Sequence, residues 1–168
     1  SIDEIMSFSP KWLYVNNEKI FNVLMPIFQN QSIHISSKMM LLLGFTNSVK
    51  GIIRKEKEVT DVSILVTENT IGLLKLLFDE ESIFVRCGQM TEVSLETVQR
   101  LVITLVDTYP IDVLSNNSMN YNSVQGMFEF FIRFYPENLT ELLKNCINQL
   151  VLEKQIKLFE RLVRIDNI

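Results

Sequence analysis

The sequence predicts an all-α fold. Apolar residues recur at steps of three and four through most of the C-terminal half, which is the spacing of one helix face. Glycine and proline are scarce, with 5 and 4 among 168 residues, whereas folds built from many short strands need turn residues more often. Eleven phenylalanines and seven methionines suit large apolar faces. These observations indicate long helices with short connections, about seven in all.

The N-terminal half contains the first two predicted helices. One lies around residues 20–28, where Pro26 would kink it or shift its start. The second covers 36–56 and begins near Ser36 or Ser37, whose hydroxyls can cap a helix. The apolar positions that indicate these helices are Ile20, Phe21, Leu24, Met25 and Phe28 in the first and Met39, Leu42, Leu43, Val49, Ile52 and Ile53 in the second.

The segment 58–67 is ambiguous. Its core, VSILVT, is β-branched and would suit a strand. A helix from Thr60 to about Phe78 would make it continuous with the apolar run IGLLKLLF, and no partner strand is evident, so we favour the helix. The short apolar segment IFVRCG at 83–88 is expected to be a loop or a brief helix.

Two C-terminal stretches align at an offset of 26 residues: TVQRLVITLVDTYP, which begins at Thr97, and SVQGMFEFFIRFYP, which begins at Ser123. Both carry apolar residues at matching helical steps, and both end in Tyr-Pro. The residue before proline avoids helical geometry, so helices at 97–109 and 123–135 should each end at the tyrosine.

Local signals also place the starts of these helices. Ser94 can cap the first helix and Asn122 or Ser123 the second, because their side-chain oxygens accept early backbone N–H groups. Between them, IDVL at 111–114 could supply one helical turn, and SNNSMNYN at 115–122 is typical of a polar loop.

Two more helices complete the chain. Pro136 suits the first turn of a helix at 137–151, where no N–H is needed. The last helix is expected at 152–166, with an apolar stripe formed by Leu152, Ile156, Phe159, Leu162 and Val163.

The helix at 123–135 carries five aromatic residues on more than one face. A helix that is apolar nearly all round should be buried on several sides, so we interpret it as a central core helix. The alternative is a helix that also presents aromatic side chains to a partner. The residues concerned are Phe128, Phe130, Phe131, Phe134 and Tyr135.

The C-terminal half resembles an α-solenoid of the HEAT or armadillo type. The 26-residue offset is shorter than the roughly 40 residues of such repeats, so the aligned stretches are not one repeat unit. The resemblance implies antiparallel helix pairs stacked as a short right-handed solenoid, which acts as a scaffold for other proteins inside a larger assembly. Because the chain begins with serine, we expect 1–168 to be a single helical-repeat domain from a longer protein. The amphipathic helices that carry the resemblance, with proline between two of them in FYPENLTELL, are 97–109, 123–135, 137–151 and 152–166.

The sequence offers no catalytic motif. It contains no GxSxG, P-loop, GxGxxG or HExxH pattern. The single histidine, His34, is expected to be structural or exposed, and the acidic run 79–81 lacks the ligand spacing of a calcium loop. Cys87 and Cys146 form neither a disulfide framework nor a zinc motif and are expected to be reduced core thiols in the cytoplasm or nucleus. We therefore expect no enzyme activity, cofactor, metal or small-molecule substrate.

The charge pattern favours proteins as partners. The formal net charge is −4 with no basic domain, which argues against general nucleic-acid binding, and no apolar run reaches the length of a membrane span. Four cations step by three and four residues along the last helix; we call them the basic ridge. They form either a solvated face, a docking surface for an acidic partner, or a contact with the next repeat: Lys154, Lys157, Arg161 and Arg164.

A second function fits the same size and helix content. A compact Bcl-2-like bundle binds a short partner helix in a groove and needs one hydrophobic helix wrapped by the others. The helix at 123–135 could serve, although the Asn-Trp-Gly-Arg type of signature is absent. Topology separates the two hypotheses, because a solenoid stacks consecutive hairpins and a Bcl-2-like bundle encloses one helix. A third hypothesis, an enzyme or an RNA-binding repeat, is disfavoured by the acidic balance.

Overall fold

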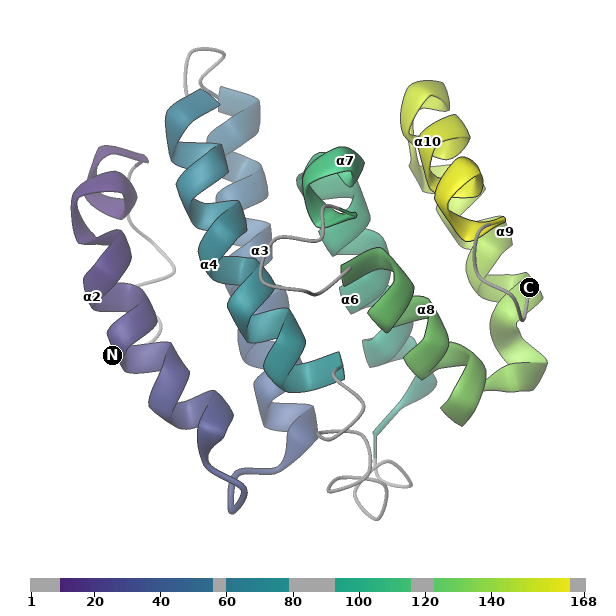
Figure 1. Ribbon diagram of the computed structural model, residues 1–168, viewed down its shortest axis with the longest axis horizontal. Coiled ribbons are helices and arrows are strands. Elements are labelled where there is room, and N and C mark those ends of the chain that lie inside the picture. The colour runs from purple at the N-terminus through teal and green to yellow at the C-terminus, as the bar shows by residue number, and fades with distance from the viewer. Residues whose placement is uncertain (1–9, 56–59, 79–92, 116–122, 164–168) are drawn as a thin grey trace.

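The computed structural model describes residues 10–55, 60–78, 93–115 and 123–163, and this part of the chain is all-helical (Figure 1). It contains no strand, so the helix favoured for the ambiguous segment is confirmed from Thr60 onward. The elements are α2 (Pro10–Gln29), α3 (Ile35–Lys55), α4 (Thr60–Phe78), α6 (Leu95–Thr108), α7 (Ile111–Leu114), α8 (Ser123–Phe134), the 3-10 helix η3 (Pro136–Asn138), α9 (Leu139–Gln149) and α10 (Leu152–Leu162).

Some predictions fall outside the described residues. These are the loop or brief helix at 83–88, the acidic run 79–81, Cys87, Arg164, Asn122 as a cap, and all but the first residue of the loop at 115–122.

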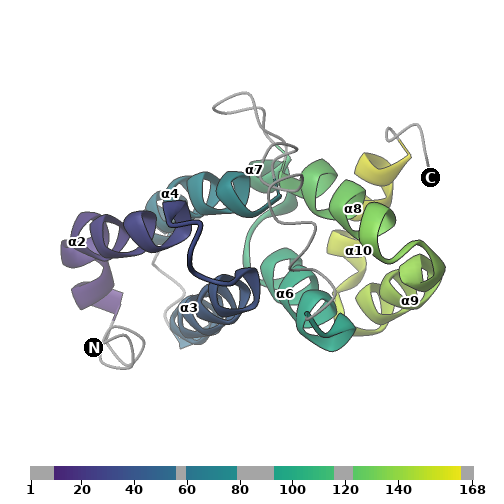
Figure 2. The ribbon, with the colours of Figure 1, turned by 90° about the horizontal axis from the view of Figure 1, so that it is seen from below.

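The helices lie in two rows (Figures 1 and 2). In one row α4 packs against both α2 and α8, and in the other α6 packs against both α3 and α9. Successive long helices from α2 to α9 therefore alternate between the rows. The single turn α7 links α6 to α8, and α10 packs against α7, α8 and α9 at the end of the molecule opposite α2. This order gives each long helix neighbours that are near in sequence.

Most local signals for α6 and its neighbours are confirmed, but the expected cap at Ser123 is wrong. Ser123 is the first residue inside α8, and its buried hydroxyl has no hydrogen-bond partner. The Ser94 hydroxyl accepts a hydrogen bond from the Thr97 N–H at 3.2 Å and caps α6. α6 ends one residue before Tyr109, and α8 ends one residue before Tyr135. Pro136 occupies the first turn of η3, where its missing N–H costs nothing. Tyr-Pro therefore ends both helices as expected.

The start of α3 differs from the prediction, because His34 caps it instead of Ser36 or Ser37. The Nδ1 atom of His34 accepts a hydrogen bond from the Ser36 N–H at 3.1 Å and lies 2.7 Å from the Ser36 hydroxyl. Since Nδ1 is an acceptor, the neutral ring carries its proton on Nε2. The single histidine thus has a structural role at a helix end.

α2 is longer than the predicted 20–28 helix, because it begins at Pro10. Pro26 lies inside α2, near its C-terminal end, and is exposed. Proline cannot donate to the carbonyl four residues earlier, here that of Asn22. Asn22 is also exposed, so water can satisfy that carbonyl and the helix continues.

α8 is a core helix with one solvent-facing stripe. Phe128, Phe130 and Phe131 are fully buried. The Phe130 ring packs edge-to-face on Phe78 of α4, with centroids 4.9 Å apart and an interplanar angle of 86°. The exposed positions of α8 follow the i, i+4 spacing of one face: Gln125, Glu129 and Arg133. This agrees with the core-helix interpretation.

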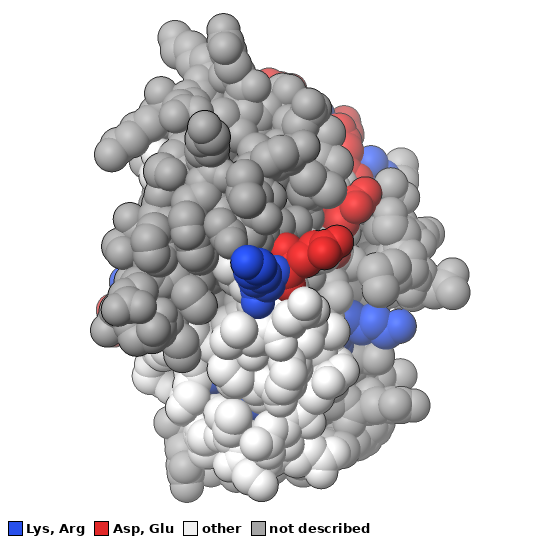
Figure 3. Space-filling view, turned by 90° about the vertical axis from the view of Figure 1, so that its left-hand side faces the viewer, with Lys and Arg blue, Asp and Glu red and all other residues white. Residues whose placement is uncertain are grey.

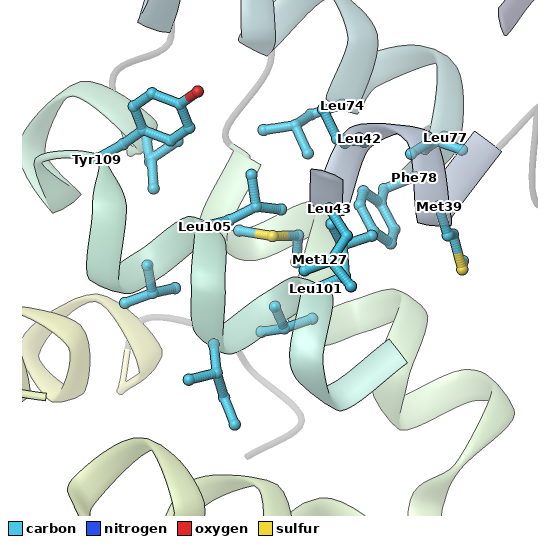
Figure 4. Close-up of a cluster of buried hydrophobic side chains, with 14 of the residues drawn as sticks. Met39, Leu42, Leu43, Leu74, Leu77, Phe78, Leu101, Leu105, Tyr109 and Met127 are labelled. Carbon is cyan, nitrogen blue, oxygen red and sulfur yellow. The ribbon is translucent and has the colours of Figure 1, made fainter. Parts of the chain in front are cut away.

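The main core forms where the two rows meet (Figure 4). α3, α4, α6 and α8 each contribute apolar side chains that are almost completely buried. Burial of this kind is the dominant stabilising contribution to folding. The residues from the four helices that Figure 4 labels in this cluster are Met39, Leu42, Leu43, Leu74, Leu77, Phe78, Leu101, Leu105 and Met127.

A small polar cluster crosses this core. The Tyr109 hydroxyl, just after α6, lies 3.2 Å from the Thr70 hydroxyl of α4 and also hydrogen-bonds Thr46 of α3. Thr46 in turn donates to the Leu42 carbonyl at 2.7 Å. Complete burial raises the pKa of Tyr109 to about 12, against the opposing effect of the two threonine hydrogen bonds. Because buried polar groups must be paired, the cluster fixes how α3, α4 and the end of α6 are aligned.

Candidate partner-binding surface

α10 carries the basic ridge, the set of residues that the sequence predicts for partner binding. Its buried side chains are Leu158 and Leu162, four residues apart on the face that meets the body of the protein. Gln155 adds a polar anchor, because its Nε2 donates to the carbonyls of Ile147 and Leu150 at 2.7 Å each. The N-terminal half of α10 is therefore fixed to the end of α9.

The first member of the basic ridge, Lys154, binds the C-terminal end of α6. Its Nζ donates to the carbonyl of Val106 at 3.1 Å and to that of Asp107. The last carbonyls of a helix have no intrahelical donor and carry partial negative charge, so an ammonium group there is favourable. Lys38 does the same for α2: it is fully buried, and its Nζ donates to the carbonyls of Phe28 and Asn30 at 3.0 and 2.6 Å.

Lys157 and Arg161 share one carboxylate. Lys157 Nζ lies 3.1 Å from Oδ2 of Asp112 in α7, and an Arg161 guanidinium nitrogen lies 3.3 Å from Oδ1. The hydrogen bonds from Lys157 and then Arg161 hold the pKa of Asp112 below its usual range, and the hydrogen bond to Asp112 raises the pKa of Lys157. All three groups are solvent-accessible, so the pairs align α7 with α10 more than they stabilise the fold.

The structure thus brings three of the four ridge residues together, against the protein itself. Lys154, Lys157 and Arg161 all contact α6 or α7. Arg164 lies outside the described residues. Binding of an acidic partner by the ridge stays a prediction, and any such partner would have to compete with Asp112.

The apolar stripe predicted for the last helix is wrong in part. Leu162 is buried as expected, together with Leu158, and Phe159 is half-buried. The other apolar side chains at this end of the molecule face solvent, and they form what we call the α10 stripe, extended by two residues from α9 and the α9–α10 link. The exposed fractions are Leu152 69%, Ile156 52% and Val163 81% in and just after α10, and Ile147 41% and Val151 63% beside it.

The spacing contained a signal for this second face. Leu158 and Leu162 lie on one side of the helix, whereas Leu152, Ile156 and Val163 follow a different line at steps of four and seven. A helix that packs against the core on one side can bury only one of two such lines, so the other line stays exposed. Scattered exposed apolar residues are ordinary, whereas these side chains gather along one helix face.

An acidic row runs beside the α10 stripe. Glu153 and Glu160 are exposed, and they lie three residues before and four residues after Ile156, which makes them its neighbours on the helix surface. Glu153 also pairs with Lys157 at 3.4 Å. The α10 surface therefore presents apolar side chains next to carboxylates, with the basic ridge beyond them turned toward α7.

A shallow cavity of about 290 Å³ lies between the end of α6, α7 and the start of α10. Its charged lining residues already have partners within the protein: Lys154 binds carbonyls, and Lys157 pairs with Glu153 and Asp112. The remaining lining residues are Thr108, Pro110, Ile111 and Val151. This arrangement offers a partner little unsatisfied charge.

The opposite end of the molecule differs in character. Between Ile20 and Val49 the only charged residue is Lys38, which is buried. Figure 3 shows this end, and the lower part of its described surface is almost entirely white, the colour of residues without charge. The exposed positions are mostly polar, and the large apolar side chains exposed there are Val23 and Met40. The two ends of the molecule thus differ in the charge of their surfaces.

Among the residues that the structure describes, the remaining chemical features include no cluster of metal ligands and no activated thiol. Among the described residues, no group of three or more His, Cys, Asp or Glu side chains is arranged to hold a metal ion. Cys146 is a buried free thiol, as expected, and burial raises its pKa to about 12, which suppresses the reactive thiolate. No helix in the described ranges has the length and apolar character needed to cross a membrane.

Comparisons with known proteins identify no relative. No family model matches the chain, and no curated protein or solved structure shows significant similarity to it.

Proposed function

We propose that the chain is a non-enzymatic helical-repeat scaffold of the HEAT or armadillo kind that binds other proteins within a larger cytoplasmic or nuclear assembly. The observation that carries the proposal is the packing order of the helices. From α2 to α9, consecutive long helices alternate between two rows, and each row is held together by contacts between every second long helix. Stacked hairpins have this order, and they present extended surfaces to partners.

The α10 stripe gives the proposal further support. Its exposed apolar side chains at Leu152, Ile156 and Val163 lie on one line of the helix surface. Apolar side chains gathered on the outside of a protein favour contact with another protein.

The Bcl-2-like alternative receives less support. It needs a helix enclosed by the others, and α8 was the candidate. α8 keeps Gln125, Glu129 and Arg133 in solvent, and α6 keeps Glu96 and Arg100 exposed. A two-row arrangement accounts for these solvent stripes, because every helix in it has an outer side.

The proposal is tested by affinity capture from extracts of the source cells, with the native chain as bait and mass spectrometry to identify bound proteins. A captured protein counts only if its complex re-forms from purified components. Two variants serve as matched baits: Lys157→Gln with Arg161→Gln in the ridge, and Leu152→Ser with Ile156→Ser in the stripe. Glutamine is used in the ridge because a glutamate there would repel Asp112 and separate α7 from α10.

We expect at least one protein to bind the native chain and to re-form the complex when purified. Loss of that protein with the ridge variant would assign its binding to the basic ridge, and loss with the stripe variant would assign it to α10. If no protein binds above the level of the empty resin, the scaffold proposal is rejected.

A further inference from the structure

We propose that the α10 stripe binds an amphipathic α-helix of a partner protein whose apolar face is flanked by lysine or arginine. The inference rests on the proposed scaffold function, and it adds the place of binding and the chemistry of the ligand. α10 lies at one end of the molecule (Figure 1), and the side chains of its stripe are exposed.

The shape of the surface favours a helix as the ligand. Leu152, Ile156 and Val163 follow a line along α10 and its C-cap residue. The line covers eleven steps of the helix, a length of about 17 Å or three helical turns. Phe159, half-buried at i+7 from Leu152, continues the same line. A partner helix places its own apolar residues at i, i+4, i+7 and i+11 and can meet such a line along its full length.

The surface is also held in place before any partner binds. On the side of α10 turned toward the body, Lys154 binds the end of α6, and Lys157 and Arg161 bind Asp112 of α7. Gln155 fixes the start of α10 to α9. A helix held on several sides loses little further freedom on binding, which favours affinity. The basic ridge thus holds α10 against α6 and α7 and keeps the stripe in position.

The charge beside the stripe specifies the flanks of the ligand. Glu153 and Glu160 adjoin Ile156, so lysine or arginine beside the apolar residues of a partner would meet opposite charge. Glu153 also pairs with Lys157 at 3.4 Å, so a cation of the partner would share that carboxylate with Lys157. The other side of the stripe carries Gln155, whose amide is already bonded to α9. A partner helix with acidic flanks would meet like charge along the Glu153 side.

The same row argues against a second copy as the occupant. Two antiparallel copies of α10 would place the row of Glu153 and Glu160 against its own equivalent, which is repulsive. Two parallel copies would place that row against the uncharged Gln155 side, which offers no compensating charge. The ligand is therefore a different helix with basic flanks.

The test uses the whole chain and three fluorescein-labelled peptides, with binding followed by fluorescence anisotropy. One peptide has leucines at i, i+4, i+7 and i+11 with lysine and arginine flanks, the second has the same leucines with glutamate flanks, and the third is a scramble of the first. We expect the basic-flanked peptide to bind at least about tenfold more tightly than the other two at low salt. The advantage over the acidic-flanked peptide should shrink as salt is added, because exposed charges are screened.

Variants of the chain locate the binding. Ile156→Asp should weaken binding of the basic-flanked peptide at least about tenfold, and Glu153→Gln with Glu160→Gln should remove most of its advantage over the acidic-flanked peptide. Glu96→Gln, which removes an exposed carboxylate from α6, is the matched control and should change neither. Circular dichroism checks that each variant retains the native helix content.

Three results would overturn the inference. Equal binding of the basic-flanked and scrambled peptides would exclude an amphipathic helix as the ligand. Binding that Ile156→Asp does not change would exclude α10 as the binding site. A native chain that self-associates in sedimentation, and that Ile156→Asp returns to a monomer, would make a second copy the occupant. If the peptides fail while affinity capture still yields a reconstituted complex, only this inference falls; if capture yields none, the scaffold proposal falls whatever the peptides do.

Discussion

Replacing Tyr109 with phenylalanine tests the buried polar cluster through its effect on stability at high pH. An unfolded tyrosine loses its proton near pH 10, whereas the pKa of Tyr109 in the folded protein is about 12. Between these values the unfolded state has released a proton that the folded state retains. The free energy of unfolding is therefore unaffected by this group below pH 10, and it falls as the pH rises from 10 toward 12. At about 1.4 kcal/mol per unit, the loss reaches about 3 kcal/mol by pH 12.

The phenylalanine variant lacks this dependence but also lacks the hydrogen bonds of the hydroxyl. Near pH 7 we expect it to be less stable than the native protein by about 1 to 2 kcal/mol, because Thr46 and Thr70 lose a buried partner. Above pH 10 the native protein loses stability faster, so the two stabilities should approach each other and become equal at roughly pH 11 to 12.

Urea unfolding followed by circular dichroism from pH 7 to pH 11 measures both effects. Other groups with raised pKa values, such as the Cys146 thiol, are common to both proteins and cancel in the difference. Tyr135→Phe is the control, since its hydroxyl is only partly buried and makes one 3.3 Å hydrogen bond to the Val93 carbonyl. Stability curves for the native protein and Tyr109→Phe that stay parallel from pH 9 to pH 11 would refute the reasoning.

Three further substitutions test the packing and the helix ends. Phe130→Ala removes a fully buried ring packed on Phe78 and should lower the free energy of unfolding by about 4 kcal/mol, measured by urea titration; a loss below about 1 kcal/mol would contradict the core position. Gly51→Ala should raise the melting temperature, with a gain of up to about 1 kcal/mol, because a Cβ there meets no atom within 4 Å and alanine favours the helix; a lower melting temperature would count against the geometry of α3. Lys154→Met should lower the free energy of unfolding by about 1 kcal/mol, because carbonyls at the end of α6 lose their donor. If 1 M salt does not reduce this loss, the charge of Lys154 contributes nothing to stability.

The sequence by itself determined most helix boundaries, because the signals that set them act within a few residues. Ser94 caps the helix it precedes, and the Tyr-Pro pairs end α6 and α8 through a clash between neighbouring residues. The ambiguous segment from Thr60 was also predictable, since a single helix joins it to the apolar run that ends at Phe78 and no partner strand is evident in the sequence. The cap of α3 was missed because histidine is an uncommon cap, although His34 stands at the position where one is needed.

Only the tertiary structure decided which face of α10 is buried. The helix has two apolar lines, and its periodicity is compatible with burial of either one, so the choice depended on which line fitted α8 and α9. Packing buried Leu158 and Leu162 and left Leu152 and Ile156 in solvent. The same holds for the basic ridge. Its spacing along α10 was readable, but its partners lie more than forty residues earlier in the chain, and only the fold brings Asp112 and the end of α6 within hydrogen-bonding distance of it.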